Sequence, residues 1–375
     1  MLPKPFLLAL CCAVVSAADI VETWPLPAGA VQPRVAVASD GTVHAAWLKG
    51  APEASEVWYA TRKPETGSWK SAQRVDTGPG SAVALGMVRG VQIALGAKDQ
   101  PHLLWPGSAK AKPRAPDDST PVLYSRMVGA RFTPPINVVK IGTGLDGGGA
   151  IAADSSGGVW LLWHAMAGAT DDAQRVALTR HSVDGGVSFS SEQKLLSWKS
   201  GMCGCCEMGA VSDGAGGVLA LLRVANGNTE RDQFLALIGS KAEAVQGQRL
   251  SSWKTPTCPM STCNAVRVGK RIWVAWETEG QVSWCEMAGT ELGKRIDAPG
   301  DGTNRKHPAI AVDAQGQLCL TWLEGSGWNR AGTLRWQVWG ADGVPVGSTG
   351  DGGKLAVWSF AAVAARPGGG FAIIH

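Results

Sequence analysis

The segment 33–47 reads PRVAVASDGTVHAAW, and its pattern recurs at 308–322 as PAIAVDAQGQLCLTW and at 149–163 as GAIAADSSGGVWLLW. Each copy holds two runs of alternating apolar residues joined by a polar turn that contains glycine, and the three copies align without gaps. Such alternation around a short turn is typical of a β-hairpin. Four less regular copies lie at 91–105, 209–223, 264–276 and 361–375. The sequence therefore predicts seven hairpins along the chain.

Further strand-like runs separate the hairpins. They are VWYATR at 57–62, VLYSRM at 122–127, VALTRH at 176–181 and LRWQVW at 334–339. A repeat of about 50 residues with four short strands per unit is typical of a β-propeller blade, which buries its faces only against neighbouring blades. The many tryptophans suit packing between such blades. We therefore expect an all-β protein, a β-propeller of four-stranded blades, seven if every hairpin counts and six if one of the weak copies does not.

The amino-terminal residues have the pattern of a secretory leader. Lys4 precedes an apolar run from Phe6 to Val15, and small residues follow up to Ala18, an arrangement typical of a signal peptide. The run is too short to cross a bilayer, and no later stretch approaches the roughly 20 apolar residues that a spanning helix needs. We therefore predict a signal peptide at 1–18, cleaved near Ala18, and a periplasmic or secreted mature protein without a membrane span.

The rest of the chain is expected to be one domain. The segment IVETWPLP at 20–27 resembles the last strand of a blade, while the hairpin at 361–375 resembles the first two strands of a blade. Together they can close a ring, which predicts a single propeller domain over 19–375. The net charge of +4 is small for 375 residues, and the basic residues are scattered, so nucleic acid is not an expected partner.

One short motif resembles a known family. SVDGGVSF at 182–189 resembles the Asp box of sialidase and BNR-repeat proteins. The resemblance extends to a bacterial, exported, sialidase-like branch through CGCCEMGAV at 203–211, ERD at 230–232, the CPM segment at 258–260 and a hairpin that ends in TWLE. In those families the Asp box is a turn between the outer two strands of a blade. The resemblance therefore implies that Asp184 is a turn residue.

Sialidase chemistry is not carried over with the resemblance. Those enzymes use a tyrosine nucleophile that comes late in the chain, whereas Tyr59 and Tyr124 are the two tyrosines here and both fall on third strands. No catalytic residue is therefore assigned, and whether the protein is an enzyme stays open. Three arginines could form an anion-binding cluster, or could serve only the structure of the blades. They are Arg34, Arg223 and Arg231.

Two segments that follow outer strands repeat each other. SWKSGMCGCCEMGAV at 197–211 aligns without gaps on SWKTPTCPMSTCNAV at 252–266. Each leads from the outermost strand of one blade to the innermost strand of the next, and such crossings share one face near the channel mouth. We therefore expect their sulfur atoms to converge. The residues concerned are Cys203, Cys205, Cys206, Met208, Cys258, Met260 and Cys263.

The mixture of cysteine and methionine favours a soft metal. The alignment places Cys205 on Met260 and Met208 on Cys263, and a methionine can replace a metal ligand but not a disulfide partner. Thiolate and thioether ligands select copper(I). Zinc fits less well, because methionine is a poor zinc ligand and paired Cys-x-x-Cys knuckles are lacking. His307 could add a nitrogen ligand, or serve only as a hydrogen-bonding residue.

Disulfides are the competing interpretation. Nine cysteines are present, and Cys11 and Cys12 fall in the predicted signal peptide. Seven remain, so in an oxidising compartment at least one thiol stays free, pairs between chains or is otherwise held. The five cysteines of the aligned segments could form two bridges and leave one thiol. Cys285 and Cys319 fall inside strands and are expected to be buried core thiols.

Three functions follow from these observations. The first is an exported propeller that binds a soft metal ion, copper(I), in acquisition, delivery or resistance. The second is a sialidase-like glycoside hydrolase. The third is a non-catalytic module of the cell envelope whose loops are stapled by disulfides. A metal ion is the expected partner in the first case, and another envelope protein in the third.

Overall fold

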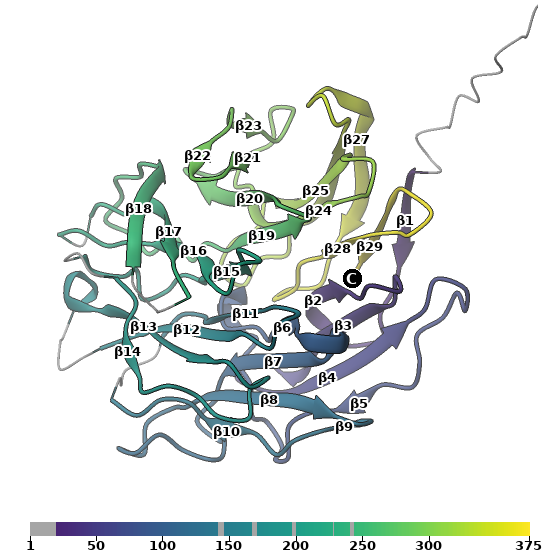
Figure 1. The fold of residues 1–375 in the computed structure, drawn as a ribbon. Coiled ribbons are helices and arrows are strands. Elements are labelled where there is room, and N and C mark those ends of the chain that lie inside the picture. Colours follow the sequence, from purple (N-terminus) through teal and green to yellow (C-terminus); the bar gives the residue numbers. More distant parts are fainter. Residues whose placement is uncertain (1–19, 142–145, 167–170, 197–199, 228, 241–243) are drawn as a thin grey trace, which may run out of the picture.

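The chain forms a ring of small antiparallel sheets. A computed structural model describes residues 20–141, 146–166, 171–196, 200–227, 229–240 and 244–375. The predicted signal peptide at 1–18 lies outside the described residues, as do Trp198 and Lys199 of the first aligned segment. Figure 1 shows the sheets arranged around a common axis, with the innermost strand of each sheet nearest to that axis.

Three blades come from the first half of the chain. Blade 1 contains β2 (Val31–Val37), β3 (Val43–Ala51), β4 (Ala54–Arg62) and β5 (Gln73–Arg74). Blade 2 contains β6 (Gln92–Leu95), β7 (Pro101–Pro106), β8 (Val122–Val128) and β10 (Ile136–Asn137), with β9 (Arg131–Phe132) paired to β8. Blade 3 contains β11 (Ala150–Ala153), β12 (Val159–Ala165), β13 (Val176–Ser182) and β14 (Gln193–Lys194).

Four blades follow in the second half. Blade 4 contains β15 (Gly209–Ser212), β16 (Val218–Arg223), β17 (Gln233–Ile238) and β18 (Ala244–Ser251). Blade 5 contains β19 (Cys263–Val268), β20 (Arg271–Thr278), β21 (Gln281–Ala288) and the short β22 (Glu291–Leu292) and β23 (Ile296–Asp297). Blade 6 contains β24 (Lys306–Val312), β25 (Leu318–Glu324), β26 (Thr333–Trp339) and β27 (Pro345–Lys354). Blade 7 contains β28 (Ala362–Ala365), β29 (Phe371–Ile374) and β1 (Val21–Trp24).

The first and last described strands meet in blade 7. Strand β1 pairs with β29 in parallel, with Val21 opposite Phe371 and Trp24 opposite Ile374. The innermost strands contact one another in the order β2, β6, β11, β15, β19, β24, β28 and again β2, so the ring is closed (Figure 1). The protein is therefore a seven-bladed β-propeller, which confirms the predicted fold class and selects seven blades rather than six.

Little regular structure lies outside the sheets. The described helices are three 3-10 turns, η1 (Leu85–Met87), η2 (Ala97–Asp99) and η3 (Asp172–Gln174). Across the described part of the chain, no helix has the length and hydropathy to cross a bilayer. The absence of helical periodicity in the sequence agrees with this architecture.

Tryptophans fill the spaces between blades, as the sequence predicts. Trp273 and Trp284 of blade 5 pack with Trp322 and Ile310 of blade 6 in one apolar cluster. Other tryptophans with almost no exposed surface are Trp47, Trp105, Trp160, Trp163, Trp276 and Trp339. A flat, large indole buries roughly 200 Å² and suits the wedge between two twisted sheets. Each blade is thus stabilised by its neighbours.

The segment 182–189 forms a turn between the outer two strands of blade 3. Asp184 accepts hydrogen bonds from the Ser182 hydroxyl at 2.6 Å and from the Ser188 hydroxyl and amide at 2.6 and 2.9 Å. These hydrogen bonds, those from Ser182 and Ser188 foremost, hold the pKa of the Asp184 carboxyl below its usual range. Asp184 is therefore a turn residue, as the resemblance implies.

The tyrosines and the strand cysteines are buried in the blades. Tyr59 on β4 and Tyr124 on β8 are buried third-strand residues, and their hydroxyls lie 2.6 and 2.7 Å from the Nδ1 atoms of His44 and His102. Cys285 and Cys319 are 2% and 0% exposed. Both expectations from the sequence are confirmed.

Candidate metal centre

The two aligned segments flank blade 4. The CGCC crossing (residues 200–208) leads from blade 3 into β15, and the CPM crossing (residues 252–262) leads from β18 into β19. Successive crossings of a propeller lie side by side on one rim of the channel. The two crossings also contact each other directly, because the Glu207 amide donates to the carbonyl of Ser261 at 3.0 Å.

Three cysteines of the CGCC crossing form a buried sulfur cluster. The Sγ atom of Cys203 lies 3.1 Å from that of Cys206 and 3.6 Å from that of Cys205, and the last two are 4.0 Å apart. The three side chains are 1%, 2% and 8% exposed in the order Cys203, Cys206, Cys205. Met260 of the CPM crossing packs against them. Such a group of sulfur atoms, all within 4.8 Å of one another, has the size of a metal site.

One cysteine of the cluster also forms a disulfide. Cys205 is bridged to Cys258 of the CPM crossing, with 6.3 Å between their Cα atoms, and Cys258 is exposed. Cys203 and Cys206 remain thiols. The disulfide and metal interpretations therefore apply to different cysteines, since one bridge stands beside two buried thiols.

Two of the predicted ligands lie apart from the cluster. Met208 packs between blades 3 and 4, among side chains that include Trp160 and Met202. Cys263 begins β19, where it packs between blades 4 and 5, and its thiol donates to the Glu207 carbonyl at 3.9 Å. Both residues stand at the start of an innermost strand, so their side chains pack in the interblade core.

Backbone hydrogen bonds fix the shape of the CGCC crossing. The Cys203 amide donates to the Arg223 carbonyl at 2.8 Å, and the Cys206 amide donates to the Cys203 carbonyl at 3.3 Å. The Cys206 carbonyl lies 3.1 Å from Nε2 of His164 on β12. Burial is the main cause that lowers the pKa of His164, to about 4, so this imidazole is neutral near pH 7. The turn therefore presents Cys203 and Cys206 on the same side.

An ion pair across the channel anchors the CGCC crossing. Glu207 accepts from Arg34 of β2 at 2.5 and 2.6 Å, and also from Gln92 of β6. Arg34 belongs to blade 1 and Glu207 leads into blade 4, and these blades are not neighbours in the ring, so the pair reaches across the channel. Burial raises the pKa of the Glu207 carboxyl, and the charge of Arg34 opposes that rise. Breaking such a buried pair costs about 3–5 kcal/mol.

A second ion pair anchors the CPM crossing. The ammonium group of Lys306 lies 2.6 Å from Oε1 of Glu277 and donates to the carbonyls of Pro259 and Met260 at 2.8 and 3.4 Å. Glu277 has no exposed surface, and burial raises the pKa of its carboxyl while Lys306 lowers it. The backbone on both sides of the Met260 side chain is thereby held by a charge from blade 6.

The three arginines considered for anion binding each pair with a residue of the protein. Arg223 donates to Ser261 Oγ at 2.6 Å, and Ser261 in turn lies 3.4 Å from Cys206 Sγ. Arg231 pairs with Asp172 at 2.7 Å. Arg34 belongs to the ion pair across the channel. Each of the three arginines therefore has a protein partner, and Arg223 and Arg231 place positive charge beside the sulfur cluster.

That positive charge acts on the thiol pair. Burial raises the pKa of Cys206, but the hydrogen bond with Cys203, the charge of Arg223 and the Ser261 hydroxyl lower it, to about 7 overall. The pKa of Cys203 is raised, by its hydrogen bond with Cys206 and by burial. Cys206 is therefore the first of the two thiols to lose its proton, and the remaining proton is shared between the two sulfur atoms.

His307 lies beside the CPM crossing and not in the sulfur cluster. Its Nδ1 atom is 3.3 Å from the Thr262 hydroxyl, and its ring stacks on Phe360 with 5.6 Å between centroids. Burial, with the charges of Lys306 and Arg34, holds the pKa of His307 well below its usual range. In this structure His307 is a hydrogen-bonding residue.

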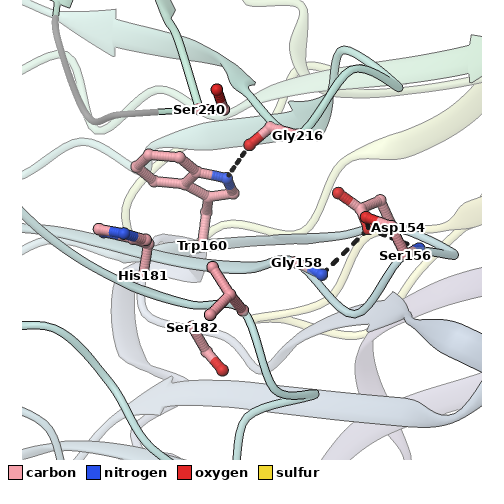
Figure 2. A pocket seen from close by; sticks show the side chains of 9 residues that line it. Asp154, Ser156, Gly158, Trp160, His181, Ser182, Gly216 and Ser240 are labelled. Atoms are coloured by element: carbon pink, nitrogen blue, oxygen red, sulfur yellow. Dashed lines mark hydrogen bonds between the residues drawn. The ribbon is translucent and has the colours of Figure 1, made fainter.

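A cavity of about 120 Å³ lies elsewhere, between blades 3 and 4. Figure 2 shows Trp160 and His181 side by side and the Trp160 indole donating to the Gly216 carbonyl, at 3.2 Å. Asp154 lines the cavity, and one of its oxygens accepts from Ser156 and Gly158 within its own turn. The cavity is lined by the β11–β12 and β15–β16 turns, by Trp160 and by residues at or just beyond the ends of β13 and β17, on the rim opposite the crossings.

The sequence analysis does not predict the contacts made by Ser261, by Glu207 or by the pair of Lys306 with Glu277. A signal for Ser261 was present, because the gapless alignment puts Ser261 on Cys206, and the structure brings this matched pair into contact. Glu207 had no such signal, since 173 residues separate it from Arg34.

Comparison with known proteins is limited to the fold. No family model and no curated protein matches the chain. A protein of unknown function from Dyadobacter fermentans is 13% identical, with 79% of this chain and 91% of that chain covered and a TM-score of 0.55. An α-L-arabinofuranosidase from Fusarium graminearum is 12% identical, with 86% and 98% covered and a TM-score of 0.54. A Hadza microbial sialidase is 10% identical, with 78% and 63% covered and a TM-score of 0.49.

At these identities the likeness shows the propeller fold alone. The resemblance expected from the sequence holds for the propeller architecture, which this chain shares with the arabinofuranosidase. The exported branch with CxCC and CPM loops stays a prediction.

Proposed function

We propose that this chain is an exported propeller that holds one copper(I) ion in the sulfur cluster between the CGCC and CPM crossings. The observation that carries the proposal is the position of the Cys203 and Cys206 thiols, 3.1 Å apart and almost without exposed surface. Two such thiolates with a thioether nearby form a donor set that favours soft monovalent copper over zinc.

The ligands would be Cys203, Cys206 and Met260. The bridge to Cys258 leaves Cys205 within 4 Å of both thiols but without a free thiolate. Two thiolates with a monovalent cation leave one net negative charge, which Arg223 and Arg231 oppose. Burial of the cluster would shield the ion and its ligands from water and oxidants.

The setting supports a role in acquisition, delivery or resistance. A leader pattern at 1–18 favours export, and Met260, which is partly exposed, offers a side from which an ion can enter. Rim loops are where propellers bind their ligands. Another envelope protein that gives or takes the ion would be the partner.

Copper(I) titration tests this proposal. The mature protein, loaded anaerobically with its two buried thiols intact, competes with a chromophoric copper(I) chelator of known affinity. We expect one ion per chain. The double variant Cys203→Ser/Cys206→Ser should bind more than about 100-fold more weakly, since even loss of an outer-shell partner costs roughly 10–100-fold.

The matched control is Cys263→Ser, which removes a buried thiol of the adjacent crossing that is not in the cluster. It should bind copper(I) like the wild type. Equal affinity in the double variant, or no uptake by wild type with both thiols titratable, contradicts the proposal.

The disulfide favours one second candidate, a non-catalytic envelope module. A bridge between Cys205 and Cys258 staples two neighbouring crossings and could serve shape alone. This candidate expects an envelope partner to bind equally well before and after metal removal. Glycoside hydrolysis has less support, because sialidase-like enzymes use a tyrosine nucleophile and both tyrosines here are buried on third strands and hydrogen-bonded to histidines.

A further inference from the structure

We propose that the four neighbouring cysteines form a thiol–disulfide exchange centre, in which the bridge moves from Cys205–Cys258 to Cys203–Cys206. The exchange rests on the geometry alone, and its consequence for copper rests on the proposed function. The two thiols proposed to bind copper(I) are therefore also the thiols that take part in the disulfide exchange.

The order of the sulfur atoms carries this inference. Cys258 is exposed and bridged to Cys205, Cys205 Sγ lies 3.6 Å from Cys203 Sγ, and Cys203 Sγ lies 3.1 Å from Cys206 Sγ. The sulfur atoms thus form a continuous path from the surface into the buried pair. The other described thiols, Cys263, Cys285 and Cys319, lie in strands of the blade cores.

Two exchange steps move the bridge without an external oxidant. First, Cys203 passes its proton to the Cys206 thiolate 3.1 Å away and attacks Sγ of Cys205, so that a Cys203–Cys205 bond forms and Cys258 leaves as a thiolate. Second, Cys206 attacks Sγ of Cys203, a Cys203–Cys206 bond forms, and Cys205 leaves and takes up the proton from Cys206.

The two steps conserve electrons, protons and the number of disulfides. The Cys203/Cys206 pair loses two electrons and two protons, and the Cys205/Cys258 pair gains them. One disulfide is present before and after, and the number of thiols is unchanged. No bound group is consumed.

The exchange would release the ion. A Cys203–Cys206 bridge removes both thiolate ligands, while Cys258 becomes a free thiol at the surface. Copper(I) held by the buried thiols would conversely keep the bridge at Cys205–Cys258, because ligation withdraws Cys203 and Cys206 as nucleophiles.

Peptide mapping of the metal-free, full-length mature protein tests the exchange. Trypsin separates 200–223, which holds Cys203, Cys205 and Cys206, from 255–267, which holds Cys258 and Cys263. The starting bridge links the two peptides, whereas the exchanged bridge is an internal loop of 200–223. Incubation under argon at pH 8, acid quenching and mass spectrometry count both species.

We expect the internal loop to accumulate with time in the wild type, together with alkylation of Cys258, and no change in total thiols. Cys203→Ala should abolish both signals. Cys206→Ala should stop after the first step, with a Cys203–Cys205 bond and an alkylated Cys258. Cys319→Ala, a buried thiol of blade 6, should behave like the wild type.

A single connectivity in the wild type at all times, or equal alkylation of Cys258 in Cys203→Ala, overturns the inference. The wild-type mapping needs no variant, so a variant that fails to fold does not affect it. Exchange without copper(I) uptake contradicts only the proposed function, and copper(I) uptake without exchange contradicts only this inference.

Discussion

The sequences 197–211 and 252–266 align without gaps, yet the CGCC and CPM crossings within them hold their sulfur atoms differently. In the CGCC crossing the cysteines point inward, and Cys203 is 1% exposed. In the CPM crossing the matched Cys258 is exposed. The bridge does not join matched positions either, because Cys205 pairs with Cys258 rather than with a residue at its own position. The repeated sequence thus forms one crossing whose cysteines are buried and a second crossing whose Met260 packs against those cysteines.

The anchors of the two crossings explain part of this difference. Glu207 fixes the CGCC crossing to blade 1 across the channel, while Lys306 fixes the CPM crossing to blades 5 and 6 at the rim. The CGCC crossing is thus held toward the channel axis, and the CPM crossing is held against blades 5 and 6.

The largest expected effect comes from removing one anchor. Arg34→Met leaves Glu207 buried without its charge partner, and we expect a loss of about 3–5 kcal/mol in the free energy of unfolding. Lys306→Met should cost less, because the Lys306 side chain is 17% exposed whereas that of Arg34 is 8% exposed. Urea denaturation followed by tryptophan fluorescence measures both.

The double variant Arg34→Met/Glu207→Leu is the control for this comparison. Removing both charges should restore most of the lost stability, since an apolar pair of similar size is often neutral or better. If Lys306→Met proves more costly than Arg34→Met, the two anchors do not differ in the way described here.

Acid should lower the stability of the fold through two buried histidines, His164 and His307, which lie beside the two crossings. His164 has a pKa of about 4 and that of His307 is also lowered, both chiefly by burial. Below pH 6.5 the unfolded chain takes up protons that the folded chain does not. The stability present above pH 6.5 is therefore lost as the pH falls, toward pH 4 in the case of His164, at up to about 1.4 kcal/mol per pH unit for each group.

Urea denaturation of the metal-free protein at several pH values checks this slope. His164→Gln keeps a donor for the Cys206 carbonyl and should flatten the dependence by the share of one histidine. An unchanged slope in both His164→Gln and His307→Gln would contradict the assignment.

A smaller effect should follow from cutting the contact between the crossings. Ser261→Ala removes the hydroxyl that accepts from Arg223 and lies beside Cys206. One guanidinium donor is left without this acceptor in a buried place, so we expect a loss of about 1–3 kcal/mol. Ser261→Thr, which retains the hydroxyl, should recover part of it. Thermal unfolding of the three proteins gives the order.

The smallest expected change in stability is at Met260. Met260→Leu conserves volume and should cost less than about 1.5 kcal/mol, while it removes the thioether. Its copper(I) affinity should fall by clearly more than that of Met208→Leu, because Met208 lies in the core between blades 3 and 4. Equal affinities in the two variants would remove Met260 from the ligand set.

Hairpin spacing made most of the fold predictable. The copies that begin at Pro33, Gly149 and Pro308 each supply the first two strands of a blade, and even the weak copies at 91–105 and 361–375 do so. The sequence also predicts that residues 20–27 join the hairpin at 361–375 to close the ring. It does not predict that β1 pairs with β29 in parallel, because local periodicity carries no information on the direction of a long-range pairing.

The site was predictable in position and not in detail. The alignment placed the two crossings together, yet it could not tell Cys203 and Cys206 from Met208 and Cys263. That distinction depends on where the turn ends and β15 or β19 begins, since alternation then directs a side chain into the interblade core. The partners of Cys206 come from β12 and the next crossing, which local sequence does not specify.

The ion pair of Glu207 with Arg34 joins blade 4 to blade 1, so it requires that the first four blades are already assembled. Cys206 directly precedes Glu207 in the chain, so this late contact also fixes the backbone beside the thiols. If the chain is exported unfolded, as proposed, its cysteines would reach their final arrangement late in folding and after export.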